Sequence, residues 1–385
     1  MRPLASPGNH ENVKKAGDRI QFCPLRKTEF FAGDNHMSKR IAIFGAGAAG
    51  SYIGAFLTRE GYDITLIDMW GQHVDVMNEK GLSVSGAQGP FTVPVKAIHL
   101  TDAINITEPF DIIFLATKSY DTEWASYWIK RFLSPTGVVV NSQNCMNDRL
   151  TASIVGFERQ VGCIMSSITV ALWEPGHVNR GGQPGRDRGH DVFRVGELHG
   201  QITPRVQEIA TMLSCIDGSH ATSNIWGERW SKLTTNSVGN PVGAMTGQGS
   251  QTFAQDPRAR LIQVHIAKET CQVGLALNVD IAPVSGVDAS TWARADERDV
   301  FEELDAKFHP RPGAADWRSS MAQDVVKGRR TEIEYMNGYT VQRGQEVGIP
   351  TPVSAAIVEV VKQIDAGTLT PDPSNVERVL GLAGM

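Results

Sequence analysis

The chain lacks the features that mark several large classes of protein. Its apolar residues never form the run of about 18 to 20 residues needed to cross a bilayer, so we predict a soluble protein with no membrane partner. The formal net charge of −5 provides no overall basic field, and we therefore expect no nucleic acid partner.

Metal-site and disulfide patterns are also missing. The 10 histidines include no H-E-x-x-H spacing, so we predict no metal site. The five cysteines are odd in number and include no C-x-x-C pair. This pattern predicts reduced thiols in a cytoplasmic protein and argues against a disulfide framework or a zinc site. The five cysteines are Cys23, Cys145, Cys163, Cys215 and Cys271.

The first 36 residues are polar and mixed in charge, and they lack the apolar core of a signal peptide. Acids such as Glu11 and Asp18 also argue against a transit peptide. We interpret residues 1–36 as an extension outside the fold. The length of the chain alone suggests two or three domains.

A glycine-rich motif follows the first apolar strand, residues 41–44, and opens a helix predicted over residues 51–60. Gly45 permits a tight turn, Gly47 lets the backbone approach a pyrophosphate, and Gly50 lets the helix pack onto the sheet. The alternative is a glycine turn with no ligand, but the elements that follow favour a dinucleotide. We assign the cofactor to Gly45, Ala46, Gly47, Ala48, Ala49 and Gly50.

An acid stands where a dinucleotide-binding motif places the ligand of the adenosine ribose. The second strand, residues 64–67, ends in Asp68, 18 residues after Gly50. No arginine occurs over residues 68–72 to bind a 2′-phosphate, and an acid would repel that group. We therefore predict NAD in preference to NADP.

Further apolar runs with polar ends predict the fold class. Residues 110–118 and 137–144 are typical of buried parallel strands, and helices are expected near residues 73–80, 122–132 and 204–213. Short strands are expected at 82–85 and 91–95, and a glycine- and arginine-rich loop at 180–189. From Ile225 the patterns are helical. We predict an α/β protein with a Rossmann-type dinucleotide-binding domain over 37–222 and a mainly α-helical domain over 223–385.

Two clusters in the helical region are candidates for catalysis. Lys232, Asn236 and Asn240 lie four residues apart, which places them on one helix face; the alternative is a solvated polar face. Ser320 and Glu332 lie on what the apolar periodicity predicts to be one long helix beginning near Ser319 or Ser320. The alternatives there are a helix cap and a surface acid.

Together, these motifs resemble the ketopantoate reductase family from Met37 to about Lys362. The motifs are G-A-G-A-A-G, A-T-K-S at 116–119, Q-N at 143–144, W-S-K-L-T-T-N-S-V-G-N at 230–240, and S-S-M-A-Q-D with R-R-T-E-I-E-Y-M-N-G over 319–338. The resemblance implies a Rossmann domain joined to a helical domain, with the substrate in the cleft between them. Family enzymes reduce 2-dehydropantoate to pantoate, usually with NADPH, on the route to pantothenate.

The resemblance also implies roles for single residues. Lys232 becomes the general acid that protonates the ketone oxygen, and its pKa is best lowered toward neutrality by burial. Glu332 orients the substrate and the lysine. The residues implied to line the cleft are Lys118 and Asn144 on the cofactor side and Asn236, Asn240 and Ser320 on the substrate side.

Three departures from the family pattern leave the reaction open. Cys145 stands where the family has glycine, no asparagine stands near Ser250, and Asp68 replaces a basic residue. The leading hypothesis is reduction of a 2-oxo acid, with ketopantoate as the default. The alternatives are NAD-dependent oxidation of another secondary alcohol or hydroxy acid, and a non-catalytic dinucleotide sensor. A homodimer is a further expectation.

Overall fold

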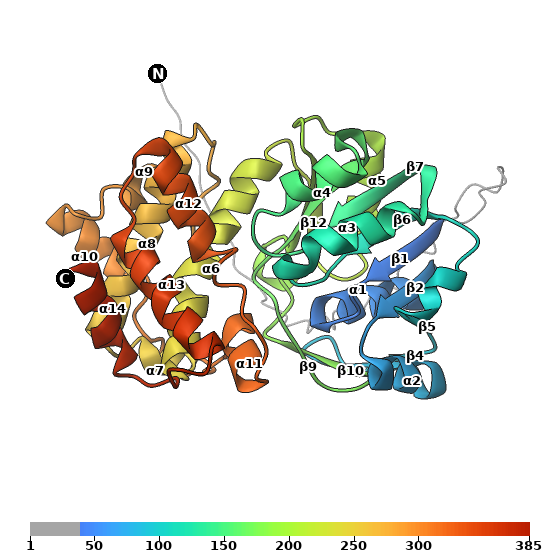
Figure 1. Ribbon diagram of the computed structural model, residues 1–385, viewed down its shortest axis with the longest axis horizontal. Helices are drawn as coiled ribbons and strands as arrows, with labels where there is room; N and C mark the ends of the chain where they lie inside the picture. The colour runs from blue at the N-terminus through green and yellow to red at the C-terminus, as the bar shows by residue number, and fades with distance from the viewer. Residues whose placement is uncertain (1–38) are drawn as a thin grey trace, which may run out of the picture. The chain divides into compact units, whose positions relative to one another are not determined.

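The computed structural model describes residues 39–385, and Figure 1 shows the order of the elements. The predicted extension, residues 1–36, lies outside the described residues, as does Cys23. The described part contains an N-terminal sheet with helices on both faces, followed by a helical half. The predicted fold class is confirmed.

An eight-stranded sheet forms the centre of the N-terminal half, in the order β12-β11-β8-β7-β6-β1-β2-β5. Neighbouring strands in the stretch β8-β7-β6-β1-β2-β5 run parallel, whereas β11 runs antiparallel to β8. Their bounds are β1 Arg40–Phe44, β2 Asp63–Asp68, β5 Lys96–His99, β6 Phe110–Leu115, β7 Leu133–Asn141, β8 Gln160–Met165, β11 Phe193–Glu197 and β12 Ser219–Ala221.

The strand order reverses at β1, which pairs with β2 on one side and with β6 on the other. In doubly wound sheets such a reversal opens a crevice at the carboxyl ends of the strands, where nucleotides bind. Gly45 follows β1 and Thr117 follows β6, so both lie at this crevice. The topology therefore places the glycine motif where a dinucleotide is expected.

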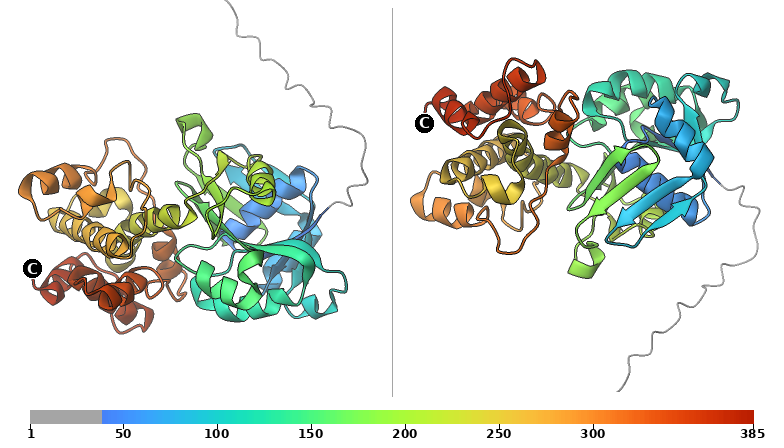
Figure 2. Two further views of the ribbon diagram at one scale, coloured as in Figure 1. Left: turned by 90° about the horizontal axis from the view of Figure 1, so that it is seen from above. Right: turned by 90° about the horizontal axis from the view of Figure 1, so that it is seen from below.

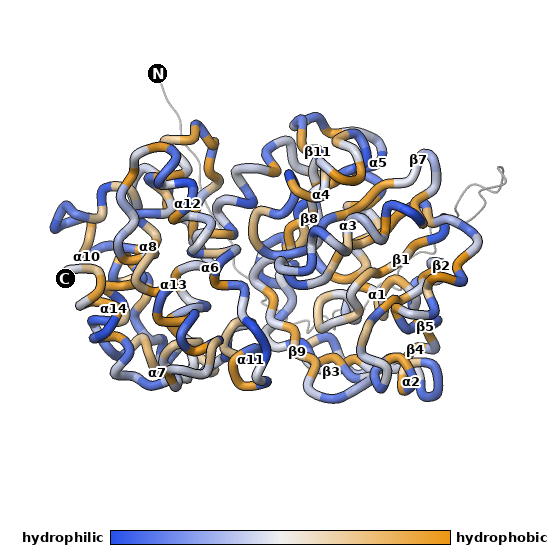
Figure 3. Tube along the Cα trace, viewed as in Figure 1, coloured by the Kyte–Doolittle hydropathy of each residue, from blue (hydrophilic) through white to orange (hydrophobic). Residues whose placement is uncertain are grey.

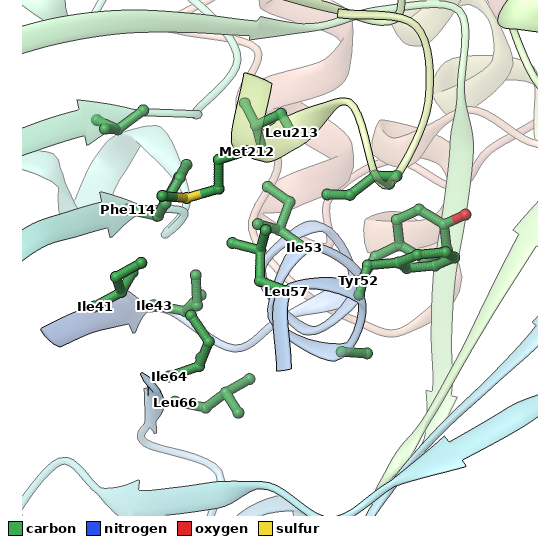
Figure 4. Close-up of a cluster of buried hydrophobic side chains, with 14 of the residues drawn as sticks. Ile41, Ile43, Tyr52, Ile53, Leu57, Ile64, Leu66, Phe114, Met212 and Leu213 are labelled. Atoms are coloured by element: carbon green, nitrogen blue, oxygen red, sulfur yellow. The ribbon is translucent and has the colours of Figure 1, made fainter. Parts of the chain in front are cut away.

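Alternate residues of β1 enter two different hydrophobic cores, because side chains of a strand point to opposite faces. Ile41 and Ile43 pack with α1 (Ala48–Arg59) and α5 (Pro204–Leu213). Ala42 and Phe44 pack with α3 (Thr122–Lys130) and α4 (Asp148–Val155). Figure 4 shows the first core, where Ile53 and Leu57 of α1 lie beside Ile43, Leu66 and Leu213.

A second, four-stranded sheet covers the outer side of α1, in the order β4-β3-β10-β9. The view from below in Figure 2 shows its strands lying over this helix. Its bounds are β3 Leu82–Gly86, β4 Phe91–Val93, β9 Thr169–Glu174 and β10 His177–Gly181. The strands expected at 82–85 and 91–95 thus belong to a separate sheet, whose other two strands come from much later in the chain.

The helical half is organised around α6 (Ile225–Thr246) and α8 (Pro257–Ala276), which pack on each other. Asn224 caps α6 by accepting a hydrogen bond from the Gly227 amide at 3.0 Å. Most residues of α6 and α8 are buried, as expected for central helices. Figure 3 shows hydrophobic and hydrophilic stretches interspersed along the chain. The other helices are α2 Gly71–Lys80, α7 Ser250–Phe253, α9 Ala289–Trp292, α10 Arg298–Ala306, α11 Ser320–Val326, α12 Asn337–Val347, α13 Pro352–Asp365 and α14 Asn375–Ala383.

The prediction of one long helix through Ser320 and Glu332 is wrong. Helix α11 ends at Val326, and Gly328 adopts a φ of +62°, a left-handed conformation that ends helices. Glu332 lies in the turns that precede α12, so it shares no helix with Ser320.

The segment predicted as a loop at 180–189 begins inside β10 and continues through the short helical turn Arg186–Arg188. Arg180 is buried and paired with the buried Asp217, whose carboxylate also accepts hydrogen bonds from the amides of Gly185 and Arg186. This arginine therefore holds the small sheet to the rest of the domain.

Within residues 39–385, no helix is long and apolar enough to cross a membrane. The same residues contain no group of three or more His, Cys, Asp or Glu side chains arranged to hold a metal ion. The four cysteines in this part of the chain are all free, at Cys145, Cys163, Cys215 and Cys271.

Candidate active site

The glycine motif makes a turn in which two positions are closed to side chains. Gly45 has a φ of +94°, and a Cβ there would lie 2.8 Å from the Thr117 amide nitrogen. A Cβ on Gly50 would lie 2.1 Å from the Gly45 carbonyl oxygen. These contacts allow β1, β6 and α1 to meet closely, as the sequence predicts.

Gly47 differs, because a Cβ there would meet no protein atom within 4 Å. Helix α1 begins at the next residue, Ala48, and no side chain caps it. The first amides of a helix have no acceptor within the helix and suit an anion. The residues present therefore fit the pyrophosphate of a dinucleotide.

A buried histidine supports this turn from beneath. The Nε2 atom of His73 lies 3.0 Å from the Ala46 carbonyl oxygen and 3.1 Å from Ser51 Oγ. Its Nδ1 atom accepts a hydrogen bond from the Gly176 amide at 2.8 Å, so the proton of the neutral ring is on Nε2. Burial lowers the pKa of His73 and keeps the ring neutral. The sequence analysis did not identify this contact.

Asp68 ends β2 beside the glycine turn. Its Oδ1 atom accepts a hydrogen bond from the Trp70 amide at 2.9 Å, which fixes the carboxylate. Within the described residues its Oδ2 atom accepts no hydrogen bond, so one oxygen remains for a ribose hydroxyl.

Lys118 follows β6 and connects the sheet to the helical half. Its ammonium contacts the Asp324 carboxylate at 2.5 Å and the Glu332 carboxylate at 3.3 Å. Glu332 Oε1 also accepts hydrogen bonds from the Ser119 amide at 2.9 Å and from Ser119 Oγ at 2.6 Å. Asn147 donates to Ser119 Oγ at 3.0 Å and extends the network.

The charges in this network perturb one another. Burial alone would lower the pKa of Lys118, but the charges of Glu332 and Asp324 outweigh burial and raise it. Burial alone would raise the pKa of Glu332, but Lys118 and the two Ser119 donors outweigh it and lower that pKa. At Asp324 burial is the larger effect, and the pKa is raised despite the contact with Lys118. Glu332 is therefore the carboxylate that remains ionised most readily.

Helix α6 crosses the carboxyl ends of the central strands. Arg229 donates hydrogen bonds to the carbonyl oxygens of Asn141 and Gln143, each at 2.7 Å, and forms an ion pair with Asp148. Asn236 Nδ2, farther along α6, donates to Asn144 Oδ1 at 3.2 Å. The predicted amides therefore meet across the boundary between the sheet and α6.

Lys232 lies on the same face of α6, one turn before Asn236. The side chain is partly buried, and within residues 39–385 its amine donates no hydrogen bond. Burial, followed by the positive charge of Arg194, lowers the pKa of Lys232 to about 8. An amine in this state can donate a proton and accept one near neutral pH.

The structure does not join Lys232 to Glu332. Within the described residues no hydrogen bond or ion pair connects them, because Glu332 binds Lys118 and Ser119. Asn240 lies one turn beyond Asn236, with its Nδ2 atom 3.9 Å from Met336 Sδ. Ser320 is partly buried at the start of α11, but the cap of that helix is Ser319.

Two positions that depart from the family pattern, Cys145 and Ser250, can be placed in the structure. Cys145 is buried with a φ of +67°, a conformation that favours the glycine typical of the family. Burial raises the pKa of its thiol, so it remains protonated. Ser250 begins α7, where its amide donates to the Trp317 carbonyl oxygen at 3.0 Å.

Several residues of the site carried no separate prediction. Ser119 and Asp324 stand inside the motifs A-T-K-S and S-S-M-A-Q-D, so the motifs contained the signal although no role was assigned. Asn147 and Arg194 stand outside every motif. Only the fold brings them to the site, through α4 and β11.

Comparisons with known proteins identify families and relatives to which this chain is similar. A family model described as "Ketopantoate reductase PanE/ApbA" matches residues 41–188, and one described as "Ketopantoate reductase PanE/ApbA C terminal" matches residues 224–365. A curated relative, the 2-dehydropantoate 2-reductase of Pyrococcus horikoshii, is 28% identical over 326 residues, which are 84% of this chain and 96% of the relative.

Solved structures share the fold. D-mandelate dehydrogenase, in a ternary structure with NADH and anilino(oxo)acetate, has a TM-score of 0.72 at 22% identity, covering 85% of this chain and 99% of that one. A dimeric ketopantoate reductase from Staphylococcus aureus has a TM-score of 0.63 at 17% identity, covering 85% and 99%.

Proposed function

This chain belongs to the ketopantoate reductase family of oxidoreductases, and we propose that it reduces a 2-oxo acid with Lys232 as the general acid. The observation that carries the proposal is the state of the Lys232 amine. It has no hydrogen-bond partner within residues 39–385, and its pKa is lowered to about 8.

A bound nicotinamide supplies or accepts hydride. The chain's own residues then stabilise the developing charge and transfer the proton. When the carbonyl carbon gains hydride, negative charge develops on oxygen, where the Lys232 ammonium stabilises it and donates a proton. Asn236 and Asn240, on the same face of α6, are the proposed ligands of the substrate's hydroxyl and carboxylate groups, together with Ser320.

In this proposal Glu332 positions Lys118. The Glu332 carboxylate holds the Lys118 ammonium at 3.3 Å and the Ser119 hydroxyl at 2.6 Å. These contacts fix the segment after β6, which borders the glycine turn. Lys118 and Asn144 are then positioned on the cofactor side of the site.

We further propose that NAD is preferred to NADP. Asp68 stands at the end of β2 with its carboxylate oriented by the Trp70 amide at 2.9 Å. The carboxylate can accept a hydrogen bond from a ribose hydroxyl, whereas it repels a 2′-phosphate. The D-mandelate dehydrogenase structure contains NADH, which agrees with this preference in a protein of the same fold.

Ketopantoate is the default substrate because the curated relative is a 2-dehydropantoate 2-reductase. The test compares initial rates with ketopantoate and with a panel of other branched and aromatic 2-oxo acids, each with NADH and with NADPH. We expect the highest kcat/KM for ketopantoate and NADH. Turnover of ketopantoate no faster than the panel average would remove it as the substrate.

A second candidate function is the oxidation of another hydroxy acid with NAD. The missing asparagine near Ser250 and the altered turn at Cys145 favour it, because both depart from the family's pattern. Running the same panel in reverse, with 2-hydroxy acids and NAD, separates the two functions. A non-catalytic sensor would turn over none of these compounds. A homodimer is proposed from the dimeric Staphylococcus aureus protein, and sedimentation equilibrium tests it.

A further inference from the structure

Arg194 lies on β11, beside the face of α6 that carries Lys232. Its Nε atom contacts Glu228 Oε2 at 3.0 Å, and its Nη1 atom donates to Ser166 Oγ at 2.5 Å. The Arg194 and Glu228 side chains are 16% and 21% exposed, so the pair is largely shielded from water. Nothing in the proposed reaction uses this pair.

Glu228 stands four residues before Lys232 on the same helix. A glutamate four residues before a lysine lies next to it on the helix surface, and the two ordinarily form an ion pair. Within residues 39–385 no ion pair joins Glu228 to Lys232, because the Glu228 carboxylate turns to Arg194. The closest natural counter-ion of the lysine is therefore occupied.

The other acids that border α6 are also occupied, each by a partner other than Lys232. These are Asp148 with Arg229, Asp280 with Asn224, Glu269 with the amides of Val353 and Ser354, and Glu332 with Lys118 and Ser119. Arg229, the nearest cation on α6, is engaged by Asp148. Arg194 is thus the charged group that affects the pKa of Lys232, and its positive charge lowers that pKa.

We propose that Arg194 is a positioning residue that holds Glu228 away from Lys232 and so keeps the reacting amine without a counter-ion. The inference rests on the proposed role of Lys232 in the reaction. Arg194 acts in two ways, by binding the competing carboxylate and by placing a second positive charge near the amine. Both effects favour the neutral amine and ease the release of its proton.

The test begins with Arg194→Gln, which frees Glu228 to rotate back toward Lys232. Reduction requires the protonated lysine, so the rate falls as pH rises through the pKa of that lysine. In the variant the alkaline limb of kcat/KM is expected to move to higher pH by about one unit or more, the effect of a new opposite charge at contact distance. An unmoved limb would overturn the inference.

Two further variants separate the effect of the freed Glu228 carboxylate from the effect of the lost positive charge of Arg194. In Arg194→Gln combined with Glu228→Gln, no carboxylate is freed, so the limb should return most of the way to its wild-type position. Arg194→Lys retains a cation that can bind Glu228 and should keep the wild-type limb. Equal shifts in the single and double glutamine variants would show that Glu228 is not the group that Arg194 restrains.

Arg260→Gln is the matched control, because it removes an ion pair of similar burial in the helical half. Arg260 Nε lies 2.8 Å from Asp305 Oδ1, and the two side chains are 13% and 18% exposed. This variant reports the general cost of losing such a pair, and its limb should not move. Thermal unfolding of every variant checks that the fold is retained.

A second readout does not depend on turnover. The rate at which acetic anhydride acylates Lys232, followed by mass spectrometry against pH, reports the neutral fraction of the amine directly. Arg194→Gln should shift this titration upward as it shifts the kinetic limb. If the wild-type protein reduces no 2-oxo acid, the proposed function fails, while the labelling titration still confirms or overturns the action of Arg194.

Discussion

The lowered pKa of Lys232 makes a quantitative prediction for the pH dependence of reduction. With a pKa of about 8, the fraction of protonated lysine falls from about 90% at pH 7 to about 1% at pH 10. If reduction requires that proton, kcat/KM should fall by about 90-fold over this interval. A lysine with an ordinary pKa near 10.4 would give less than about a twofold fall over the same interval.

The assay is the initial rate of NADH oxidation at limiting 2-oxo acid, measured from pH 6 to 10.5. The reverse reaction needs the neutral amine, so kcat/KM for oxidation should rise over the same range and level off above the pKa. Lys232→Arg supplies a group that stays protonated throughout. The alkaline limb should disappear in this variant, whatever activity remains.

Two results would refute the reasoning. A wild-type profile that is flat to pH 10 would show that the amine keeps an ordinary pKa or plays no part in proton transfer. A limb near pH 8 that persists in Lys232→Arg would assign the titration to another group.

Three other predictions concern the cofactor and the stability of the fold. Asp68→Arg should raise the NADPH-to-NADH ratio of kcat/KM by at least about tenfold, the equivalent of 1.4 kcal/mol, and an unchanged ratio would remove Asp68 from the ribose site. Ser119→Ala removes a 2.6 Å hydrogen bond to the Glu332 carboxylate and should lower the free energy of unfolding in urea by about 1.5 to 3 kcal/mol. Ser126→Ala, which removes a 3.5 Å contact between buried hydroxyls, is its control, and equal losses would contradict a special role for the Glu332 contact. Burial alone would raise the pKa of Asp217, but hydrogen bonds from the Arg186 and Gly185 amides and from Arg180 lower it to about 2, so this group stabilises the fold above pH 3.8 and loses that effect as pH falls toward 2. Asp217→Asn should therefore cost about 2.5 kcal/mol at pH 7 and much less near pH 2, whereas an equal cost at both values would contradict the linkage.

The elements proposed to bind the nucleotide could be predicted from the sequence because their signals are local. The G-x-G-x-x-G turn, the strand before it and the acid 18 residues after Gly50 depend on backbone geometry over a short stretch. The face of α6 that carries Lys232, Asn236 and Asn240 follows from helical periodicity alone. These predictions needed no knowledge of distant contacts.

The break between Ser320 and Glu332 could not be found in the same way. The apolar residues Met321, Val325, Ile333 and Met336 keep a helical spacing across a turn, and a single glycine, Gly328, ends the helix. Ile333 and Met336 lie in the turns before α12, and periodicity does not register a left-handed residue that separates a helix from such turns. The glycine itself was the signal for the end of α11.

The partners of the charged groups depend on topology. Lys118 and Asp324 are 206 residues apart, yet they contact each other. Arg194 reaches Glu228 because α6 packs against β11, which runs antiparallel beside β8. Such contacts are set by strand order and helix packing, which composition and spacing do not specify.

The most direct test of the central claim compares wild-type protein with Lys232→Ala. NADH binding, measured by fluorescence titration, should be unchanged within about twofold, because the glycine turn and Asp68 lie on another element. The rate of 2-oxo acid reduction should fall by at least about a hundredfold, the lower range for loss of acid–base catalysis. Wild-type turnover in the variant would contradict the assignment of the proton to Lys232.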